Sequence, residues 1–581
     1  MTPMAPNIST PIDAASPGTP NPKHPPLLIH LRGSQREMGT QHGQILREVG
    51  GFEKCFSFYP ALAERLILLG LPASPFKRAY PLALRPLFEW GLRRLEKARP
   101  LCYRERSHAF SHALGRNPKE GRHQFVTDLF QNVVGLSERL GIIRAGIGAS
   151  PACSTLIVWG RSSSDGKLRH ARNFDLPGEG IWDQAPTVVF CTPESGLRYG
   201  FVATRGADVP GITAFNEAGI ALSFHTRFHR NVRFDGLGAV DLGHEIIRRA
   251  ETLNDAIRIA GERPIASTWG IAISSGHEQQ AILVETTGNH IRVTEPANGE
   301  SHLASANRYR HPDLQVGEVT LSPVWPVHSK SRETRMNQVV ARGRENGGLG
   351  IQDLQCLLGD HIDPEAPNHP RAAGSVIANP ASVKSVVVEP ESRSLWFSIG
   401  TAPTGWGPFV KIEWNWNEEV GFKQIESSAQ RWSHRQQPVA GYRHFLRACT
   451  LQIKGADAGE CLSELECAVT LAPRDPAYRF LAGALCVQTE SFERAFRHFE
   501  MALSVENGTF RRGQILLWAS RAASALGDAE GAQKHRDELL GIKGENLEAY
   551  RAAARREAHA PLPPRRLRKT FSNLMVVDAH C

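Results

Sequence analysis

The chain has 581 residues, of which 41% are hydrophobic and 22% are charged, as in ordinary soluble globular proteins. This length exceeds what a single hydrophobic core supports, so two or three domains are expected. The formal net charge of +9 is spread along the chain, and the one dense basic run, PPRRLRK near Lys569, is typical of a solvated tail. Nucleic-acid binding is therefore not expected.

The ten cysteines form no CxxC pair and no disulfide-like spacing, which predicts reduced thiols. Residues 1–26 are rich in Pro, Ser and Thr and lack the apolar stretch of a signal peptide, so a disordered leader is expected. No apolar run reaches the roughly 18 residues of a membrane-spanning helix. These features predict a cytoplasmic protein without a transmembrane segment.

Residues 27–152 are predicted to form a mainly helical N-terminal segment, a candidate propeptide or small subunit. The run LLIHLRG is typical of a strand, and a helix is expected over His42–Val49. Apolar clusters at Leu62–Leu69 and Leu82–Leu95 alternate with Arg and Lys, which indicates amphipathic helices. Packing on a core is the simpler interpretation, and a membrane-surface helix at Leu82–Arg99 is the alternative.

Residues 153–417 change to a pattern of β-hairpins. The predicted pairs are STLIVWG with LRHARNFDL, APTVVFCTP with LRYGFVATRG, GITAFN with IALSFHTRF, and SVKSVVVEP with SLWFSIG. Helices are expected over Leu242–Gly261, Ser329–Arg344 and Gln352–Leu358. Long antiparallel runs with a few helices between them indicate a layered α+β catalytic domain.

The remainder of the chain is predicted to contain a linker over 418–440, a helical domain over 441–550 and a basic tail over 551–581. Ala468 and Ala502 lie 34 residues apart, and Gly483, Ala495 and Phe499 fall between them. This spacing of small and aromatic residues resembles a tetratricopeptide repeat, in which small residues let paired helices approach. The resemblance implies an all-α repeat domain that could bind a protein partner.

Cys153 is the candidate nucleophile. The small residues and proline of GIGASPA precede it, polar Ser154 and Thr155 follow, and Arg172 and Asp175 return on the neighbouring predicted strand. A guanidinium group beside a thiol lowers the thiol pKa and favours the thiolate. The alternatives are a small buried hydrophobic cysteine and a surface ion pair of Arg172 with Asp175.

The segment CSTLIVWG…DGKLRHARNFD resembles the nucleophile region of N-terminal-nucleophile hydrolases, in particular the acyl-coenzyme A:6-aminopenicillanic-acid acyltransferase family, with the choloylglycine hydrolases as relatives. Five further segments of this chain resemble motifs of that family and occur in the same order: HLRGSQREMGTQHG, ITAFNEAGIAL, ASANRYRH, HSKSRETR and SVKSVVVEP. The resemblance extends over about Leu28–Trp414. It implies a four-layer αββα sandwich.

The resemblance also implies how the site works. Cleavage between Ala152 and Cys153 would make Cys153 an N-terminal residue, whose own α-amine is the general base. An α-amine has an unperturbed pKa of about 7.7–8.0, which suits proton transfer at neutral pH. Arg172 would lie against the thiolate, and Asp175 would orient the amine.

Three further residues receive roles from the same resemblance. Asn216 and Asn307 would donate hydrogen bonds to the tetrahedral oxyanion. The alternative for Asn216 is a turn residue of FNEAG, and for Asn307 a cap at a strand end. Arg332 would be a charged support of the site, with Arg335 as its rival.

The resulting expectation is an autoproteolytic cysteine amidohydrolase or acyltransferase that acts on linear, non-peptide amide bonds through a thioester. Its substrate would be a small-molecule acyl amide or acyl donor, and acyl-coenzyme A could serve as co-substrate. No cofactor or metal is expected, since His244–Glu245 lacks the second histidine of HExxH, and His225 and His229 fall on a predicted strand. The alternative is an inactive core that acts as a scaffold through the helical domain. For an enzyme, deletion after about Gly441 is expected to leave catalysis intact.

Overall fold

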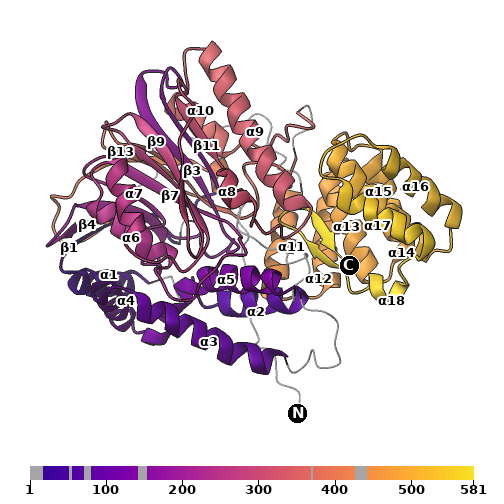
Figure 1. Ribbon diagram of the computed structural model, residues 1–581, viewed down its shortest axis with the longest axis horizontal. Helices are drawn as coiled ribbons and strands as arrows, with labels where there is room; N and C mark the ends of the chain where they lie inside the picture. Colours follow the sequence, from indigo (N-terminus) through magenta and orange to yellow (C-terminus); the bar gives the residue numbers. More distant parts are fainter. Residues whose placement is uncertain are drawn as a thin grey trace.

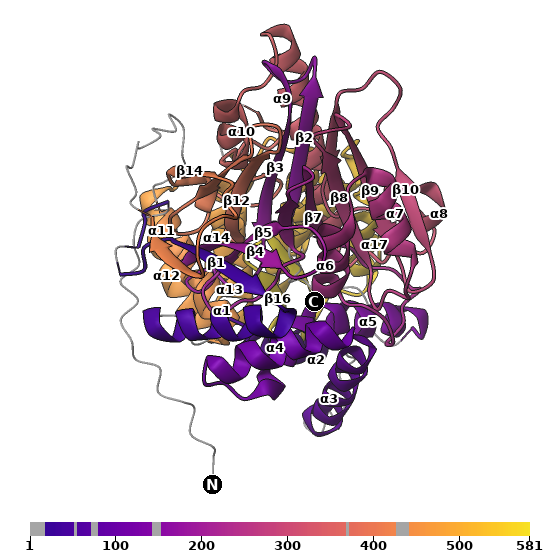
Figure 2. The same cartoon turned by 90° about the vertical axis from the view of Figure 1, so that its left-hand side faces the viewer.

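The centre of the molecule is a pair of β-sheets packed face to face, with helices on both outer faces (Figures 1 and 2). The computed structural model describes residues 18–21, 23–50, 55–70, 80–141, 153–367, 371–425 and 441–580. The predicted α+β class and the αββα arrangement are confirmed. Among the described helices, none combines the length and apolarity needed to cross a membrane.

The larger sheet has nine strands, and all neighbours are antiparallel except β1 and β4. In spatial order its strands are β10 (Ile291–Thr294), β9 (Gln280–Thr286), β8 (Trp269–Ser275), β7 (Ile220–Thr226), β6 (Thr213–Asn216), β5 (Tyr199–Thr204), β4 (Pro186–Pro193), β1 (Leu27–Gly33) and β15 (Gly421–Gln424). The hairpins predicted for β4 with β5 and for β6 with β7 are confirmed.

The smaller sheet has six antiparallel strands. In order they are β11 (His302–Ser305), β2 (Ser154–Gly160), β3 (Gly166–Asp175), β12 (Ser382–Glu389), β13 (Ser394–Ser398) and β14 (Phe409–Glu413). The predicted hairpins β2–β3 and β12–β13 are confirmed. Alternate side chains of the two sheets meet in a shared core, where Phe190 and Phe215 of the larger sheet pack against Val386 and Phe397 of the smaller.

Separate helices cover the two outer faces. α6 (Ala239–Arg249) and α7 (Leu253–Gly261) pack on the larger sheet, whereas α9 (Val324–Glu345) and α10 (Ile351–Leu358) pack on the smaller one. The single helix predicted over Leu242–Gly261 is two helices. Ala250 is extended, and the Thr252 side chain accepts the Asp255 N–H to begin α7, so a cap interrupts one continuous apolar pattern.

The N-terminal helices lie along one end of the larger sheet (Figure 2). They are α1 (Gln35–Val49), α2 (Tyr59–Gly70), α3 (Tyr80–Ala98), α4 (Leu101–Ala113), the 3-10 helix η2 (Pro118–Phe125) and α5 (Val126–Arg139). α1 begins earlier than expected, because Ser34 and Glu37 form a capping box that satisfies N–H groups at its start. The leader and linker predictions fall mostly on residues outside the described ranges.

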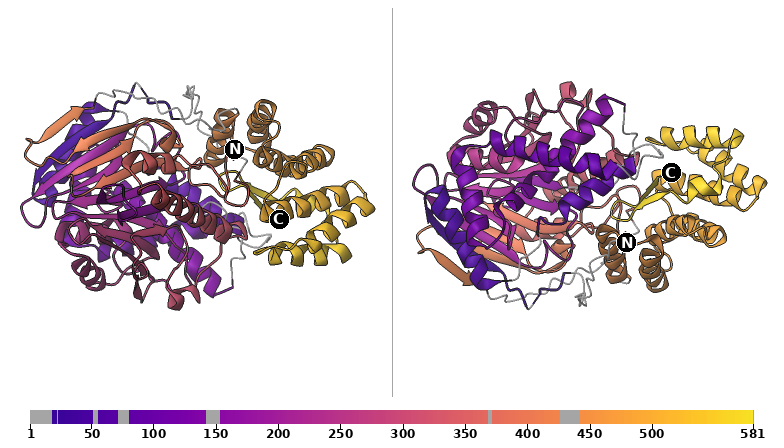
Figure 3. Two further views of the ribbon diagram at one scale, coloured as in Figure 1. Left: turned by 90° about the horizontal axis from the view of Figure 1, so that it is seen from above. Right: turned by 90° about the horizontal axis from the view of Figure 1, so that it is seen from below.

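A series of helices from Tyr442 to Leu567 lies beside the sandwich (Figure 3). They are α11 (Tyr442–Lys454), α12 (Ala458–Leu471), α13 (Pro476–Gln488), α14 (Phe492–Leu503), α15 (Thr509–Ala525), α16 (Ala529–Gly541), α17 (Glu548–His559) and the short α18 (Pro564–Leu567). Ala468, Ala495, Phe499 and Ala502 are buried, and a Cβ on Gly483 would lie 2.6 Å from the Phe499 ring. The all-α region is confirmed, and its assignment to tetratricopeptide repeats stays a prediction.

The end of the chain differs from the expected basic tail. Its basic residues near Lys569 are exposed, but the residues after them form a hairpin of β16 (Phe571–Asn573) and β17 (Asp578–His580). Buried apolar side chains hold this hairpin against the helices: Leu574, Met575, Val576, Val577 and Ala579. The apolar run NLMVV follows the charged one, and its burial explains why the segment folds back.

Two short elements complete the described structure. They are α8 (Pro312–Gln315) and the 3-10 helix η3 (Thr404–Trp406).

Candidate active site

Cys153 immediately precedes β2 and lies at the wall of an apolar pocket. The side chain is 2% exposed, and Phe174, Leu176 and Phe224 line the pocket beside it. The Arg172 Nη2 atom is 3.7 Å from the Cys153 Sγ atom, and the thiol lies 3.9 Å from the main-chain oxygen of Asp175. The expected grouping of Cys153, Arg172 and Asp175 is therefore present.

The sheets themselves fix the position of Arg172. In the β2–β3 ladder Arg172 lies opposite Thr155. Its side chain points between the sheets, because it contacts residues of the larger sheet. Its guanidinium donates to Thr213 Oγ1 at 2.7 Å, to the Phe224 main-chain oxygen at 2.9 Å and to the Ile212 main-chain oxygen. Because these acceptors belong to the larger sheet or to the turn before it, the arginine joins the two sheets beside the thiol.

Burial raises the pKa of the Cys153 thiol, and the positive charge of Arg172 only partly opposes that rise. The expected net lowering by Arg172 is thus outweighed by desolvation. A thiol with a raised pKa is protonated at neutral pH. This site consequently needs a base to generate the thiolate.

Asp175 is buried at the end of β3 and is held by a residue that the sequence did not indicate. The Asn379 Nδ2 atom donates to Asp175 Oδ2 at 2.7 Å. Burial raises the pKa of Asp175 to about 7, and the charge of Arg332 opposes the rise. Asn379 lies in an irregular segment, 371–381, where neither periodicity nor a turn motif marks it as a partner of Asp175.

Arg332 of α9 is fully buried and holds the main chain of Cys153. Its Nη1 donates to the Cys153 main-chain oxygen at 2.6 Å and to Ser154 Oγ at 3.0 Å. Its Nη2 donates to Asn307 Oδ1 at 2.8 Å. Arg335, the rival candidate, instead bonds Asp360 Oδ2 at 2.6 Å. The geometry thus brings Arg332, and through it Asn307, to the site.

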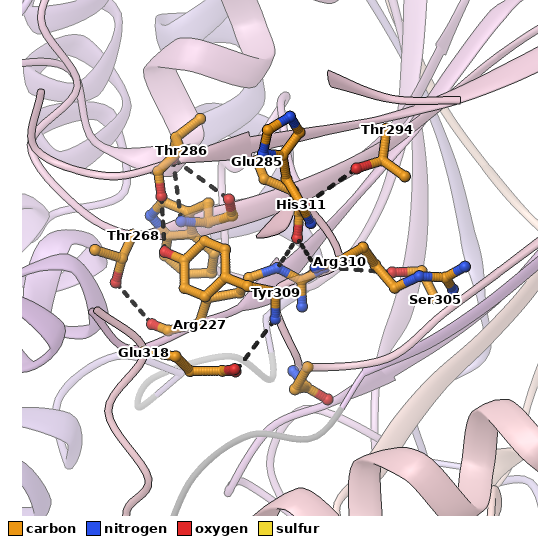
Figure 4. Close-up of polar contacts among 12 residues, drawn as sticks. Arg227, Thr268, Glu285, Thr286, Thr294, Ser305, Tyr309, Arg310, His311 and Glu318 are labelled. Carbon is orange, nitrogen blue, oxygen red and sulfur yellow. Dashed lines mark hydrogen bonds and ion pairs between the residues drawn. The ribbon is translucent and has the colours of Figure 1, made fainter. Parts of the chain in front are cut away.

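The loop after Asn307 is anchored by a buried polar cluster (Figure 4). Glu285 accepts the main-chain N–H groups of Arg310 and His311, each at 2.8 Å, and forms an ion pair with Arg227 at 3.2 Å. The Tyr309 hydroxyl donates to the Thr286 main-chain oxygen at 2.8 Å. Since both members of the ion pair are fully buried, this cluster fixes the loop that carries Asn307.

Asn216 does not take the role expected for it. Its Nδ2 atom donates to the main-chain oxygens of Ile247 and Ala250, at 2.9 and 2.8 Å, and its Oδ1 accepts the Ile220 N–H at 3.0 Å. Both amide hydrogens are used, so none remains for an oxyanion. The turn interpretation of Asn216 fits these contacts, which fasten the β6–β7 turn to the end of α6. Ala152 lies outside the described residues.

A line of hydrogen bonds between the sheets runs beside the arginine. Ser274 Oγ, His170, Ser223 Oγ, Thr155 Oγ1 and His225 Nε2 follow one another at 2.9 Å per step. We call this line the inter-sheet polar chain. Burial lowers the pKa of His170 to about 3 and that of His225 well below its ordinary value, so both rings are neutral at pH 7. The hydrophobic pattern of the sequence does not predict the inter-sheet polar chain, because its residues occupy inward-facing strand positions that are expected to be apolar.

Within the described residues, one group has the donor types of a metal site, and it lies far along the chain in the C-terminal helices. It consists of Glu466, Cys486 and His498. The Arg494 guanidinium already donates to Glu466 at 2.7 Å. This cationic neighbour disfavours a divalent ion there.

Residues 164–399 match the profile of the acyl-coenzyme A:6-aminopenicillanic acid acyl-transferase family. The resemblance predicted from the sequence is confirmed. The matched region contains Arg172, Asp175, Asn307 and Arg332, and Cys153 precedes it. No curated protein matches the chain.

Two solved structures are similar to parts of the chain. One is the Caenorhabditis elegans ortholog of N-acylethanolamine-hydrolyzing acid amidase, with 12% identity and a TM-score of 0.30, covering 41% of this chain and 93% of that one. The other is a mutant of the conjugated bile acid hydrolase from Clostridium perfringens, with 11% identity and a TM-score of 0.32, covering 48% of this chain and 97% of that one.

Proposed function

We propose that this protein is an N-terminal-nucleophile amidohydrolase or acyltransferase in which Cys153 is the nucleophile. The observation that carries the proposal is the position of the Cys153 thiol, at the wall of an apolar pocket, with Arg172 beside its sulfur and Arg332 on its main-chain oxygen. The match to an acyltransferase family supports acyl transfer as the chemistry.

The reaction begins after hydrolysis of the Ala152–Cys153 bond. The new α-amine takes the thiol proton, and the thiolate attacks the carbonyl carbon of an amide substrate. The tetrahedral intermediate collapses as the protonated amine returns a proton to the leaving nitrogen, which yields a free amine and a thioester on Cys153. Water or an acceptor amine then attacks the thioester, releases an acid or a new amide, and restores the thiol.

The remaining residues position these reactants. Arg332 holds the main chain of Cys153, and Asn307 orients Arg332. Asp175 is the candidate to orient the freed amine. Asn307, whose Nδ2 atom also donates to the Thr226 main-chain oxygen at 3.0 Å, stays the candidate amide donor to the oxyanion. The apolar lining of the pocket suits the acyl part of a small-molecule substrate with a linear amide bond.

Mass spectrometry of the intact purified protein tests the maturation step. A fragment that begins at Cys153 is expected, and Cys153→Ala should abolish both its formation and turnover of an acyl-amide panel. Cys191→Ala is the matched control, since Cys191 is also buried and lies 3.8 Å from an arginine nitrogen, Arg106 Nη2, but does not line the pocket.

Two results together would overturn the proposal: an uncut chain whose Cys153 resists alkylation, and a Cys153→Ala variant as active as the wild type. The scaffold alternative is not favoured, because Arg172, Asp175 and Arg332 are assembled around the Cys153 residue rather than dispersed.

A further inference from the structure

The same pocket contains a second buried chemical group that the reaction above does not use. Asp128, in the first turn of α5, lines the pocket together with Cys153 and is 1% exposed. Its neighbours in the lining include the apolar side chains of Val240, Trp269 and Phe224. A carboxylate in such surroundings is costly unless a partner compensates it.

One oxygen of Asp128 has a structural task. Its Oδ1 accepts the main-chain N–H of Ala239, the first residue of α6, at 3.1 Å, and the indole N–H of Trp269 at 2.9 Å. These bonds cap α6 and tie it to β8. An asparagine would accept both equally well through its own Oδ1, so this task does not require a charged side chain.

The other oxygen, Oδ2, accepts no side-chain or main-chain hydrogen bond from another residue in the described part of the chain. Within that part, no arginine, lysine or histidine forms an ion pair with Asp128. Arg99, at the neighbouring α3–α4 junction, is paired with Asp241 at 2.6 Å. Asp128 therefore brings an acceptor without a partner from another described residue to the wall of the pocket that Cys153 also lines.

Burial raises the pKa of Asp128 to about 7, and the neighbouring Asp241 adds to the rise. A positively charged or hydrogen-bond-donating ligand would relieve both effects, whereas a hydrocarbon chain would leave the carboxyl without a partner.

We infer that Asp128 Oδ2 binds a hydrogen-bond-donating group, an ammonium or a hydroxyl, carried by the acyl part of the substrate. The acyl part is assigned on the basis of the proposed function, but the binding itself does not depend on catalysis. Asp128 lies outside residues 164–399, so the N-terminal helices of this chain supply the selectivity to a core that matches the family. The shared core of α5 and the larger sheet would keep Asp128 in place after cleavage at Cys153.

Calorimetry on the wild-type protein measures this selectivity without turnover, because the probes are free acids that contain no amide bond. The probes are saturated fatty acids of four to ten carbons whose far end is a methyl, a hydroxyl or an amine. At the chain length that binds best, the hydroxyl- or amine-ended acid is expected to bind about tenfold more tightly than the methyl-ended acid. This ratio of dissociation constants corresponds to about one hydrogen bond to a charged group. A preference for the amine over the hydroxyl identifies an ammonium ligand.

Asp128→Asn should abolish that ratio for the amine-ended acid and reduce it for the hydroxyl-ended acid, because the charged Oδ2 acceptor is replaced by an NH₂ donor while the bonds to Ala239 and Trp269 persist. Asp457→Asn is the matched control. Asp457 Oδ1 also accepts two main-chain N–H groups in a helix cap, at 2.8 and 3.0 Å, but lies in the C-terminal helices. It should leave the ratio unchanged.

The inference is overturned if the parent protein binds methyl-ended acids as tightly at every length, a result that needs no folded Asp128 variant. It is also overturned if Asp128→Asn keeps the ratio. Since the probes are bound and not hydrolysed, either failure is distinct from a failure of Cys153 as nucleophile.

Discussion

Two opposing effects act on the Cys153 thiol, and their balance decides how the residue can react. Desolvation raises its pKa, and the Arg172 guanidinium, 3.7 Å away, lowers it by a smaller amount. Burial likewise raises the pKa of Cys55, Cys191 and Cys449. Among the buried cysteines that the structure describes, Cys153 alone combines an arginine contact with a place in the apolar pocket. The proposed nucleophilic role of Cys153 therefore requires a neighbouring base together with Arg172.

Replacing Arg172 by Gln should raise the Cys153 pKa further, because the effect that lowers it is removed. The midpoint of the pH dependence of Cys153 alkylation by iodoacetamide, followed by peptide mass spectrometry, is expected to move to higher pH by about 1–3 units. Arg172→Lys keeps the positive charge and should shift the midpoint less. An unchanged midpoint in folded Arg172→Gln would show that the guanidinium does not act on the thiol.

At the scale of single elements, α9 presents two arginines less than one turn apart with different surroundings. Arg332 bonds the Cys153 main chain, Ser154 and Asn307, whereas Arg335 bonds Asp360 near the surface. The forked geometry of a guanidinium is required for the first set of contacts, and a lysine cannot reproduce it.

Arg332→Lys is therefore expected to lower kcat by about 10–100-fold, the equivalent of one or two lost hydrogen bonds to a charged donor. KM should change little, because Arg332 does not line the pocket. Arg335→Lys, on the same helix, provides the comparison and should leave kcat near that of the wild type. If both variants lose activity equally, the effect belongs to α9 as a whole and not to the Cys153 contact.

The elements that the sequence predicted well are those whose signals are local. Period-two patterns and Gly-containing turns predicted the hairpins, and the Cys153, Arg172 and Asp175 grouping followed from one of them. Contacts between distant segments could not be predicted in this way. Asn379 reaches Asp175 from an irregular loop, Asp128 reaches the pocket from a helix whose own pattern is ordinary, and both amide hydrogens of Asn216 are used by α6.

At the scale of the whole molecule, the C-terminal helices are not an independent appendage. Tyr442 and Phe445 share a buried cluster with Val324 of α9, Trp406 and Ala378, which lies in the segment that carries Asn379. Loss of these helices would expose the cluster beside the site. The packing therefore argues against the expectation that deletion after about Gly441 leaves catalysis intact. Such a truncation should instead lower both the stability of the sandwich and the turnover of substrate.

Two ion pairs join the sandwich to these helices and allow a matched test. Arg371 and Glu506 are both buried and lie 2.5 Å apart, whereas Lys330 and Glu545 are exposed and also 2.5 Å apart. Arg371→Ala leaves a buried carboxylate unpaired, which should reduce the free energy of unfolding by about 3–5 kcal/mol. Lys330→Ala should cost about 1 kcal/mol or less.

Urea unfolding monitored by tryptophan fluorescence measures both changes. A single transition that moves to lower urea in Arg371→Ala is expected if the sandwich and the helices unfold together. Two separate transitions, of which only one moves to lower urea in Arg371→Ala, would contradict the shared core.

The inter-sheet polar chain constrains hydrogens that lie far apart in the fold. Ser223 and Thr155 have one hydroxyl hydrogen each, and every bond between His170 and His225 is used only if all of them point the same way. If Thr155 donates to His225 Nε2, then His170 must donate from its own Nε2. If His225 donates from Nε2, His170 must accept there and carry its hydrogen on Nδ1. The two neutral imidazoles therefore hold opposite tautomers, and a tautomer change in one sheet requires the reverse change in the other.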